Sequence, residues 1–267
     1  MNTMNNYDYI EGVEFNGLIP AIMEQEGVKT IGNELEVIDF VGTAFGDKED
    51  NEDDEGSDDD DTHEYVDLGL PSGTLWATEN IKDENGNDLY FAWGETSGYT
   101  SGQVGTDKYF AFFDREHADY KFGAFDLNDE TNSGATKYNS TDGKTTLDAE
   151  DDAATANWGS SWKMPTKEQC EELTANTTTA WTQVYGVNGL LCTSTANTNT
   201  LFFPAVGNAG DGEVNDIGSY GGCWSVSLND IHITEAYFIF FGIGECEVVY
   251  DSRCYGYSVR PVFSQNL

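Results

Sequence analysis

The stretch Tyr65-Val-Asp-Leu-Gly-Leu-Pro-Ser-Gly-Thr-Leu-Trp76 opens the best-patterned part of the chain. Two short apolar segments flank a Pro-Ser-Gly turn, which predicts strand, turn and strand. Pro165 and Thr166 followed by Glu168 predict a helix that ends near Asn176. No unit of about 20–50 residues repeats, so a propeller or solenoid is disfavoured. Further strands are predicted at 89–93, 181–185, 189–194, 201–204, 222–228, 235–241 and 257–262, which together indicate an α+β fold with short antiparallel strands and one or two helices.

The charge of the chain excludes several classes of partner. Its 267 residues include 12 basic and 49 acidic side chains, for a net charge of −37. Such a surface repels phosphate backbones and anionic lipid, so we expect no nucleic acid partner and no membrane insertion. The first ten residues do not resemble a secretion signal, and no apolar run has the length of a membrane helix. Five cysteines without CxxC spacing favour reduced thiols in a protein made in the cytosol.

Composition divides the chain into three regions. Residues 1–46 carry modest apolar groups broken by glycines, too few for a stable core of their own. Residues 47–64 hold twelve acids and one lysine, which predicts an extended, solvated linker. Residues 65–267 contain most of the aromatic residues and form the predicted globular domain. This order suggests a small attachment segment, a spacer and a binding domain.

Several short sequence motifs resemble those of one protein family. They are Tyr65 to Thr78, Phe91-Ala-Trp-Gly-Glu-Thr96, Trp158-Gly-Ser-Ser-Trp-Lys-Met-Pro-Thr166, Leu201-Phe-Phe-Pro-Ala205, Trp224-Ser225, Ala236-Tyr237 and Gly256-Tyr-Ser-Val-Arg-Pro-Val262. Together they resemble paralogous surface domains of gut anaerobes and their phages. That family is similar in fold to formylglycine-generating enzymes, a loop-rich variant of the C-type lectin fold. The resemblance covers about 200 residues and implies a C-type-lectin-like ligand-binding domain.

The C-terminal tract resembles the variable proteins of diversity-generating retroelements. In those proteins a tract between a Trp-Ser and an Arg-Pro-Val lines the ligand face. Adenine mutagenesis of Asn codons cannot give Lys, Glu, Gln, Met or Trp. Residues 219–262 contain no Lys, Gln or Met, and the resemblance implies that Trp224, Glu235, Glu245 and Glu247 are fixed by the template. The resemblance implies a scaffold of residues from the family motifs, in which Arg260 pairs with an acid or with carbonyls. Between these residues we expect one exposed ligand face formed by Asn229, Asp230, Ile231, His232, Phe238, Phe241, Ile243, Tyr250, Asp251, Tyr255 and Tyr257. For Phe238 and Phe241, the alternative is that both are ordinary inward-facing strand residues.

Catalysis finds weaker support in the sequence. Formylglycine-generating enzymes use a reactive cysteine pair that engages copper, and Cys246 and Cys254 are the nearest candidates here. Their spacing is longer, and both lie within the suspected variable tract. The sequence also has no G-x-S-x-G elbow for a serine nucleophile. We therefore expect a binding protein rather than an enzyme.

One acidic stretch is a candidate Ca²⁺ site. Asp148, Glu150, Asp151 and Asp152 cluster the hard oxygen ligands that Ca²⁺ prefers. Such an ion would stabilise a fold with many loops. The alternative is a solvated acidic turn followed by a short helix capped by an Asp.

These observations lead to a functional hypothesis. The protein is expected to be a phage receptor-binding protein, part of the virion tail, whose C-terminal face binds a host cell-surface receptor, either a protein or a glycan. Residues 1–46 are expected to attach it to other tail proteins and to form a homotrimer. The alternatives are a bacterial surface or secreted adhesin and, from another class, an oxidase resembling formylglycine-generating enzymes.

Overall fold

The computed structural model describes residues 30–31, 34–35, 63–110, 119–123 and 134–263. Most of the predicted attachment segment (1–46) and linker (47–64) therefore lies outside the described residues. Within them, β1 (Thr30–Ile31) pairs antiparallel with β2 (Glu34–Leu35). No helix in the described part of the chain is long and apolar enough to cross a membrane.

The Tyr65–Trp76 stretch folds as the sequence predicts. β3 (Tyr65–Asp67) and β4 (Leu75–Ala77) pair antiparallel, and the turn between them closes with a hydrogen bond from the Gly73 N–H to the Leu70 carbonyl. Gly73 has φ of 72°, a conformation that glycine adopts without steric cost. β14 (Val262–Phe263) inserts between β4 and β5 (Trp162–Lys163), so the sheet order is β3-β4-β14-β5.

The described helices are short and well capped. After the 3₁₀ turn η1 (Ala149–Asp151), Asp152 accepts hydrogen bonds from Ala154 and Thr155 N–H groups and begins α2 (Ala153–Trp158). Thr166 begins α3 (Lys167–Ala175) in a capping box with Gln169, and Asn176 ends it. The prediction of a helix from Thr166 to Asn176 is confirmed.

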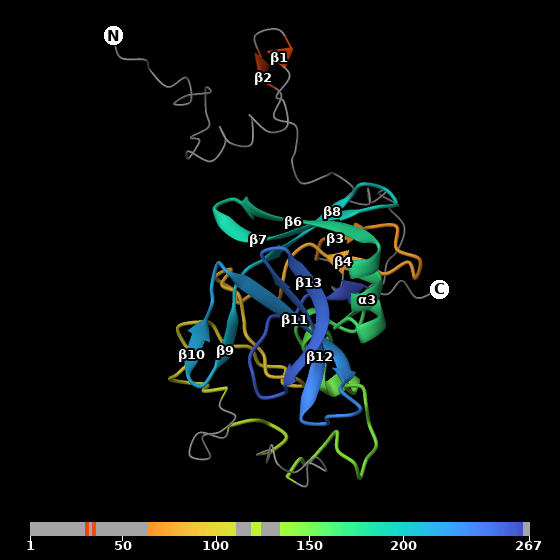
Figure 1. Ribbon diagram of the computed structural model, residues 1–267. Helices are drawn as coiled ribbons and strands as arrows, with labels where there is room; N and C mark the ends of the chain where they lie inside the picture. The colour runs from red at the N-terminus through yellow and green to blue at the C-terminus, as the bar shows by residue number, and fades with distance from the viewer. Residues whose placement is uncertain (1–29, 32–33, 36–62, 111–118, 124–133, 264–267) are drawn as a thin grey trace, which may run out of the picture.

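Three further antiparallel units complete the body (Figure 1). One sheet, β6-β7-β8, lies across the upper part of the view, and the small β9-β10 pair lies at the left. The third sheet, β11-β12-β13, has α3 packed against it. The strands are β6 (Thr177–Val184), β7 (Val187–Ser194), β8 (Thr200–Pro204), β9 (Asn208–Gly210), β10 (Glu213–Asn215), β11 (Tyr220–Leu228), β12 (Glu235–Gly242) and β13 (Glu245–Ser252).

The central strand β12 contributes to two hydrophobic cores. Phe238 packs into the larger core, which also holds Trp93 and Trp224. Ile239 and Phe241 pack into the second, with Trp76 and residues of α3, β7 and β8. Because successive side chains of a strand point to opposite faces, β12 is buried on both sides. The sheet β11-β12-β13 is thus held rigidly between two packed layers.

The structure differs from the predicted strands in two places and adds others. Residues 89–93 form only isolated bridges, Tyr90 with Tyr99 and Phe91 with Tyr257, because their backbone groups bond to separate segments. Of residues 257–262 only Val262 lies in a strand. Within the globular domain, β5, β9, β10 and β13 were not predicted. The fold class is nevertheless confirmed as a loop-rich α+β fold, with few helices and many antiparallel strands in small sheets.

Candidate functional site

The residues of the C-terminal tract that belong to the motifs of the family resemblance form a buried scaffold. Trp224, Ser225, Ala236, Ser258 and Val259 are fully buried. The Trp224 indole Nε1 donates to the Phe91 carbonyl at 2.8 Å, and Ser225 Oγ donates to the Tyr237 carbonyl at 2.8 Å. The first bond joins the tract to a distant part of the chain and the second joins β11 to β12, so the backbone of the tract is fixed. Tyr237 is the exception, since its ring is half-buried beneath the Lys167 ammonium group.

Arg260 is the electrostatic anchor of this scaffold. Its guanidinium is fully buried and donates to Asn80 Oδ1 at 2.8 Å, to the Ala77 carbonyl at 3.0 Å and to the Phe202 carbonyl at 3.0 Å. Its expected pairing with carbonyls is confirmed. A planar fork of donors can join three backbone segments in this way, which a lysine cannot reproduce.

Four of the predicted ligand residues are buried, and for them the prediction of an exposed face is wrong. These are Asn229, Phe238, Phe241 and Tyr257, each no more than 3% exposed. Phe238 and Phe241 enter the two cores on opposite sides of β12. Tyr257 stacks on Phe238 with ring centroids 4.3 Å apart, and its hydroxyl donates to Asp251 at 2.6 Å.

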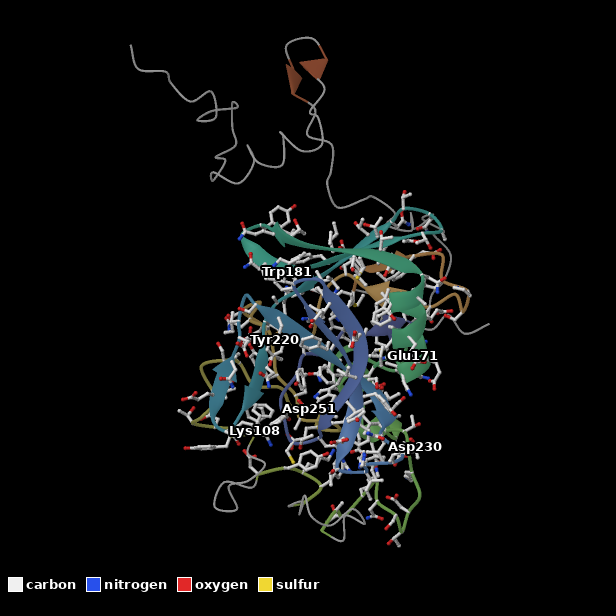
Figure 2. The ribbon with its side chains drawn as sticks, viewed as in Figure 1. Lys108, Glu171, Trp181, Tyr220, Asp230 and Asp251 are labelled. Atoms are coloured by element: carbon white, nitrogen blue, oxygen red, sulfur yellow. The ribbon has the colours of Figure 1, made fainter. Side chains whose placement is uncertain are left out.

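A second group of predicted residues is exposed and gathers at one end of the sheet. Ile231 is 74% exposed, and Asp230 and His232 beside it are also exposed. The buried Asn229 shapes this loop, because its side-chain oxygen accepts hydrogen bonds from the Ile231 and His232 N–H groups. Tyr250 of β13 is 51% exposed, and its ring lies 6.3 Å from the His232 ring. We call Asp230, Ile231, His232 and Tyr250 the loop cluster, and Figure 2 labels Asp230 within it.

The remaining predicted residues lie elsewhere. Asp251 and Tyr255 are half-buried, and Asp251 follows Tyr250 in β13, so the two side chains point to opposite faces of the sheet. Burial raises the pKa of Asp251 despite the hydrogen bond from Tyr257. Ile243 is exposed in the turn after β12, at the other end of the strand from the loop cluster. The predicted residues therefore fall into four groups and do not converge on one surface.

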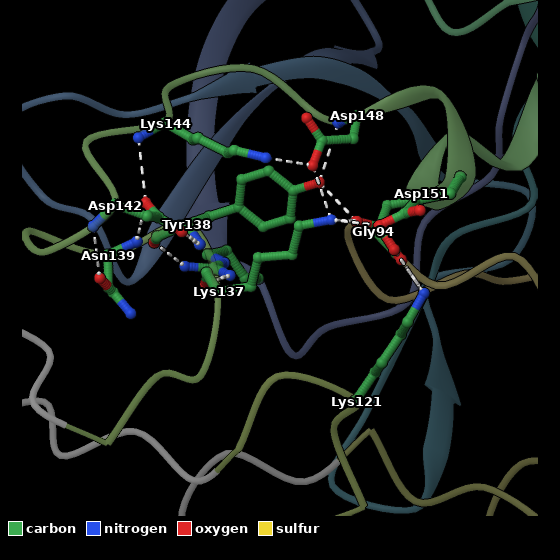
Figure 3. Close-up of polar contacts among 11 residues, drawn as sticks. Gly94, Lys121, Lys137, Tyr138, Asn139, Asp142, Lys144, Asp148 and Asp151 are labelled. Atoms are coloured by element: carbon green, nitrogen blue, oxygen red, sulfur yellow. Dashed lines mark hydrogen bonds and ion pairs between the residues drawn. The ribbon is translucent and has the colours of Figure 1, made fainter.

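Three of the four candidate metal residues lie in a network of lysines, and Figure 3 shows Asp148 and Asp151 with Lys121, Lys137 and Lys144 around them. One carboxylate oxygen each of Asp148, Glu150 and Asp151 lies within 4.8 Å of the others. The Lys137 ammonium group contacts all three, at 2.7, 2.8 and 2.5 Å. Lys121 also pairs with Asp151 at 2.6 Å, and Lys144 with Asp148 at 2.5 Å. Ammonium groups thus lie where a cation would bind.

Asp152 does not belong to this group. It is 4% exposed and accepts hydrogen bonds from the N–H groups of Ala154, Thr155 and Met164. Burial raises the pKa of this carboxyl, and the three N–H donors oppose the effect. The alternative assignment, an Asp-capped helix after an acidic turn, is the correct one for Asp152. Calcium binding by the other three carboxylates stays a prediction.

The structure also brings out residues that sequence reasoning missed. Arg253 is fully buried, donates to the Tyr138 and Ile233 carbonyls at 2.9 Å, and lies 4.8 Å from the Trp93 ring. The sequence did contain a signal for this residue, since Arg253 is the only lysine or arginine between Lys167 and Arg260. Tyr185 and Ile217 are highly exposed, and nothing in their local sequence pattern marked them.

The two cysteines of the oxidase alternative are both free thiols, Cys254 buried and Cys246 half-buried. Burial raises the pKa of the Cys246 thiol to about 11 and that of Cys254 to about 12. The reactive thiolate is therefore disfavoured at neutral pH in both.

Comparison of the chain with protein-family models, with curated proteins and with solved structures gives no match.

Proposed function

We propose that the protein is a receptor-binding protein with a C-type-lectin-like domain, and that the loop cluster of Asp230, Ile231, His232 and Tyr250 contacts a host surface ligand. The observation that carries the proposal is the contrast within one tract. Apart from the half-buried Tyr237, the residues of its family motifs are buried, whereas the loop cluster between them is exposed. Exposed loops on a rigid scaffold are the usual position of binding residues.

The chemistry of the loop cluster suits recognition. An exposed isoleucine, a tyrosine and a histidine provide apolar area, aromatic area and hydrogen-bonding groups within one small surface. Asn229 fixes the loop through the Ile231 and His232 N–H groups, so little ordering entropy is lost on binding. Side chains at these positions can change without loss of core packing, which is what a diversified surface requires.

The wider hypothesis places this domain at the distal end of a phage tail protein. In it, residues 1–46 attach to other tail proteins as a homotrimer, and the acidic segment 47–64 separates them from the domain. The charge pattern of the sequence supports that order. A bacterial surface adhesin would use the same loop cluster, and a reverse transcriptase gene beside the coding sequence would favour the phage protein.

The test replaces the loop cluster and measures binding to cells. The variant Ile231→Ser/His232→Ser/Tyr250→Ser and the wild type are labelled and added to a panel of gut anaerobes in flow cytometry. A control variant, Thr178→Ala/Ala180→Ser/Gln183→Ser, changes exposed positions on β6. We expect wild type and control to bind the same strains, and the loop variant to lose binding while keeping its melting temperature. Binding by the folded loop variant at the wild-type level would refute the proposal.

A further inference from the structure

Three turns meet at the end of the molecule opposite the loop cluster. They are the Tyr185-Gly186 turn between β6 and β7, the turn at residues 216–219 before β11, and the Ile243-Gly244 turn between β12 and β13. Asn188 Nδ2 donates to the Gly218 carbonyl at 3.0 Å, which joins the first turn to the second. Tyr220 pairs with Gly242, which joins the second to the third. In Figure 2 this region lies on the side of Trp181 and Tyr220.

Each of the three turns exposes a large apolar side chain. Tyr185 is 88% exposed, Ile217 62% and Ile243 75%, and the neighbouring Val187 is 45% exposed. We call these four residues the turn patch. They make up four of the six large apolar side chains that are exposed in the described residues. Such clustering at one place marks an interaction site rather than the scattered apolar surface that every protein has.

The backbone of the turn patch is held in place. Tyr185 has φ of 48° and Gly186 φ of 83°, the left-handed pair that closes a two-residue hairpin. The Gly218 N–H donates to the Ala205 carbonyl at 2.7 Å, so the second turn is fixed to the segment after β8. A preorganised patch loses little entropy on binding.

Acidic side chains surround the turn patch. Asp216 precedes Ile217, Glu245 follows the Ile243 turn, and Glu213 and Glu247 lie on the adjoining strands β10 and β13, all exposed. Residues 168–252, which include all three turns, contain eleven Asp and Glu and no Lys or Arg. The patch is therefore an apolar centre with a negative rim.

We propose that the turn patch is a docking surface for a second protein with an apolar centre and a rim of lysine and arginine. Opposite charges around a desolvated apolar centre give both orientation and fast association. A second copy docked through the same patch would place one acidic rim against another. Residues 1–46 carry eight acids and one lysine, and residues 47–64 carry twelve acids and one lysine, so neither segment supplies a basic rim.

This surface is separate from the proposed receptor site. Residues 230–232 precede β12 and Tyr250 pairs with Tyr237 near its start, whereas the turn patch lies at its end, so about 17 Å or more of strand separates the two surfaces. Both surfaces can therefore be occupied at once. The failure of one proposal leaves the other intact, because the variants that test them share no residue.

The test uses the full chain and two short amphipathic peptides, one of leucine and lysine and one of leucine and glutamate. The variant Tyr185→Ser/Ile217→Ser/Ile243→Ser removes the apolar centre, and the control Tyr185→Phe/Ile217→Val/Ile243→Val keeps it. We expect saturable binding of the lysine peptide to wild type and control, and binding about tenfold weaker or more in the serine variant. The glutamate peptide should not bind.

A second variant keeps the proposal testable if the serine variant is poorly folded. Asp216→Asn/Glu245→Gln/Glu247→Gln removes the rim charges alone and should weaken binding and reduce its dependence on salt. Equal binding of the lysine peptide by wild type, serine variant and rim variant would show attraction to the acidic linker only and would overturn the proposal. Sedimentation that shows a wild-type dimer and a monomeric serine variant would also overturn it, because the occupant would then be a second copy.

Discussion

Replacing Lys137 by methionine tests how the acidic cluster is held. Lys137 is the one lysine in the described network that contacts Asp148, Glu150 and Asp151 together. Methionine keeps most of the volume of the lysine stem but removes its charge. Three carboxylates within 4.8 Å would then share two peripheral lysines, Lys121 and Lys144. We expect the variant to fold and to be less stable.

The magnitude follows from the burial of Asp151. Its side chain is 4% exposed, and breaking a buried ion pair by removing one partner costs about 3–5 kcal/mol. Asp151 keeps Lys121 at 2.6 Å and the Tyr138 hydroxyl at 2.5 Å, which reduces the loss to about 2 kcal/mol. For a domain of this size that corresponds to a fall in Tm of about 4–8 °C.

The pH dependence gives a second signature. Hydrogen bonds from Lys137 and Lys144 lower the pKa of Asp148. Burial alone would raise the pKa of Asp151, but hydrogen bonds from Lys121, Lys137 and Tyr138 outweigh it and lower the pKa. Carboxyls with a lowered folded pKa stabilise the fold above their ordinary value of 3.8, and that contribution is lost as the pH falls through the folded pKa. The difference in stability between wild type and Lys137→Met should therefore be largest near neutral pH and shrink below about pH 4.

Calorimetric melting at several pH values is the assay, with Lys144→Met as the matched control. Among the described residues Lys144 forms an ion pair with Asp148 alone, and its side chain is 43% exposed, so its removal should change Tm little. A Lys137→Met variant that melts with wild type or with the control would refute the reasoning. So would a difference that persists undiminished at pH 3.

Three further expectations follow from the same structure. Arg260→Met leaves the oxygens of Asn80, Ala77 and Phe202 without their donor. Urea denaturation should therefore show a free energy of unfolding lower by about 3 kcal/mol. An unchanged denaturation midpoint would contradict the anchoring role. Because burial raises the pKa of Asp251, its carboxyl group destabilises the folded state less as the pH falls from neutral toward 4. Wild type should therefore gain stability relative to Asp251→Asn over that range. Parallel stability profiles of the two proteins would contradict this expectation. Ca²⁺ at a hundred times its dissociation constant adds about 2.7 kcal/mol, and it should raise the Tm of Lys137→Met more than that of wild type. Melting curves of both proteins that respond neither to chelator nor to Ca²⁺ would remove calcium from this cluster.

The sequence predicted the fold where turn and cap chemistry is local. The Pro-Ser-Gly turn before Thr74 and the Thr166 cap depend on residues a few positions apart, and both appear as predicted. Strand β13 was missed because Glu245, Glu247 and Asp251 give it the composition of a loop. The antiparallel pairing of β13 with β12 determines its conformation, and that pairing is not visible in a single sequence.

The candidate site was harder to predict, for a physical reason. The sequence Ala236-Tyr-Phe-Ile-Phe-Phe241 is a continuous apolar run, which is typical of a strand buried on both faces. The resemblance to variable proteins led instead to the prediction that Phe238 and Phe241 lie on an exposed face. The run itself was the signal that they belong to the two cores. The acidic cluster pairs with Lys121 and Lys137, which lie in segments where the sequence shows no helix or strand pattern. These pairs could therefore not be predicted from the sequence.

The position of β14 has a consequence for biosynthesis. This strand lies between β4 and β5, and the nearby Arg260 bonds the Ala77 carbonyl, 183 positions earlier in the chain. During translation, β3 and β4 therefore leave the ribosome long before the strand that completes their sheet. Contacts so distant in sequence slow folding, and the apolar residues of β4 remain unprotected meanwhile. Mutual repulsion among the many carboxylates would then keep nascent chains apart until the sheet closes.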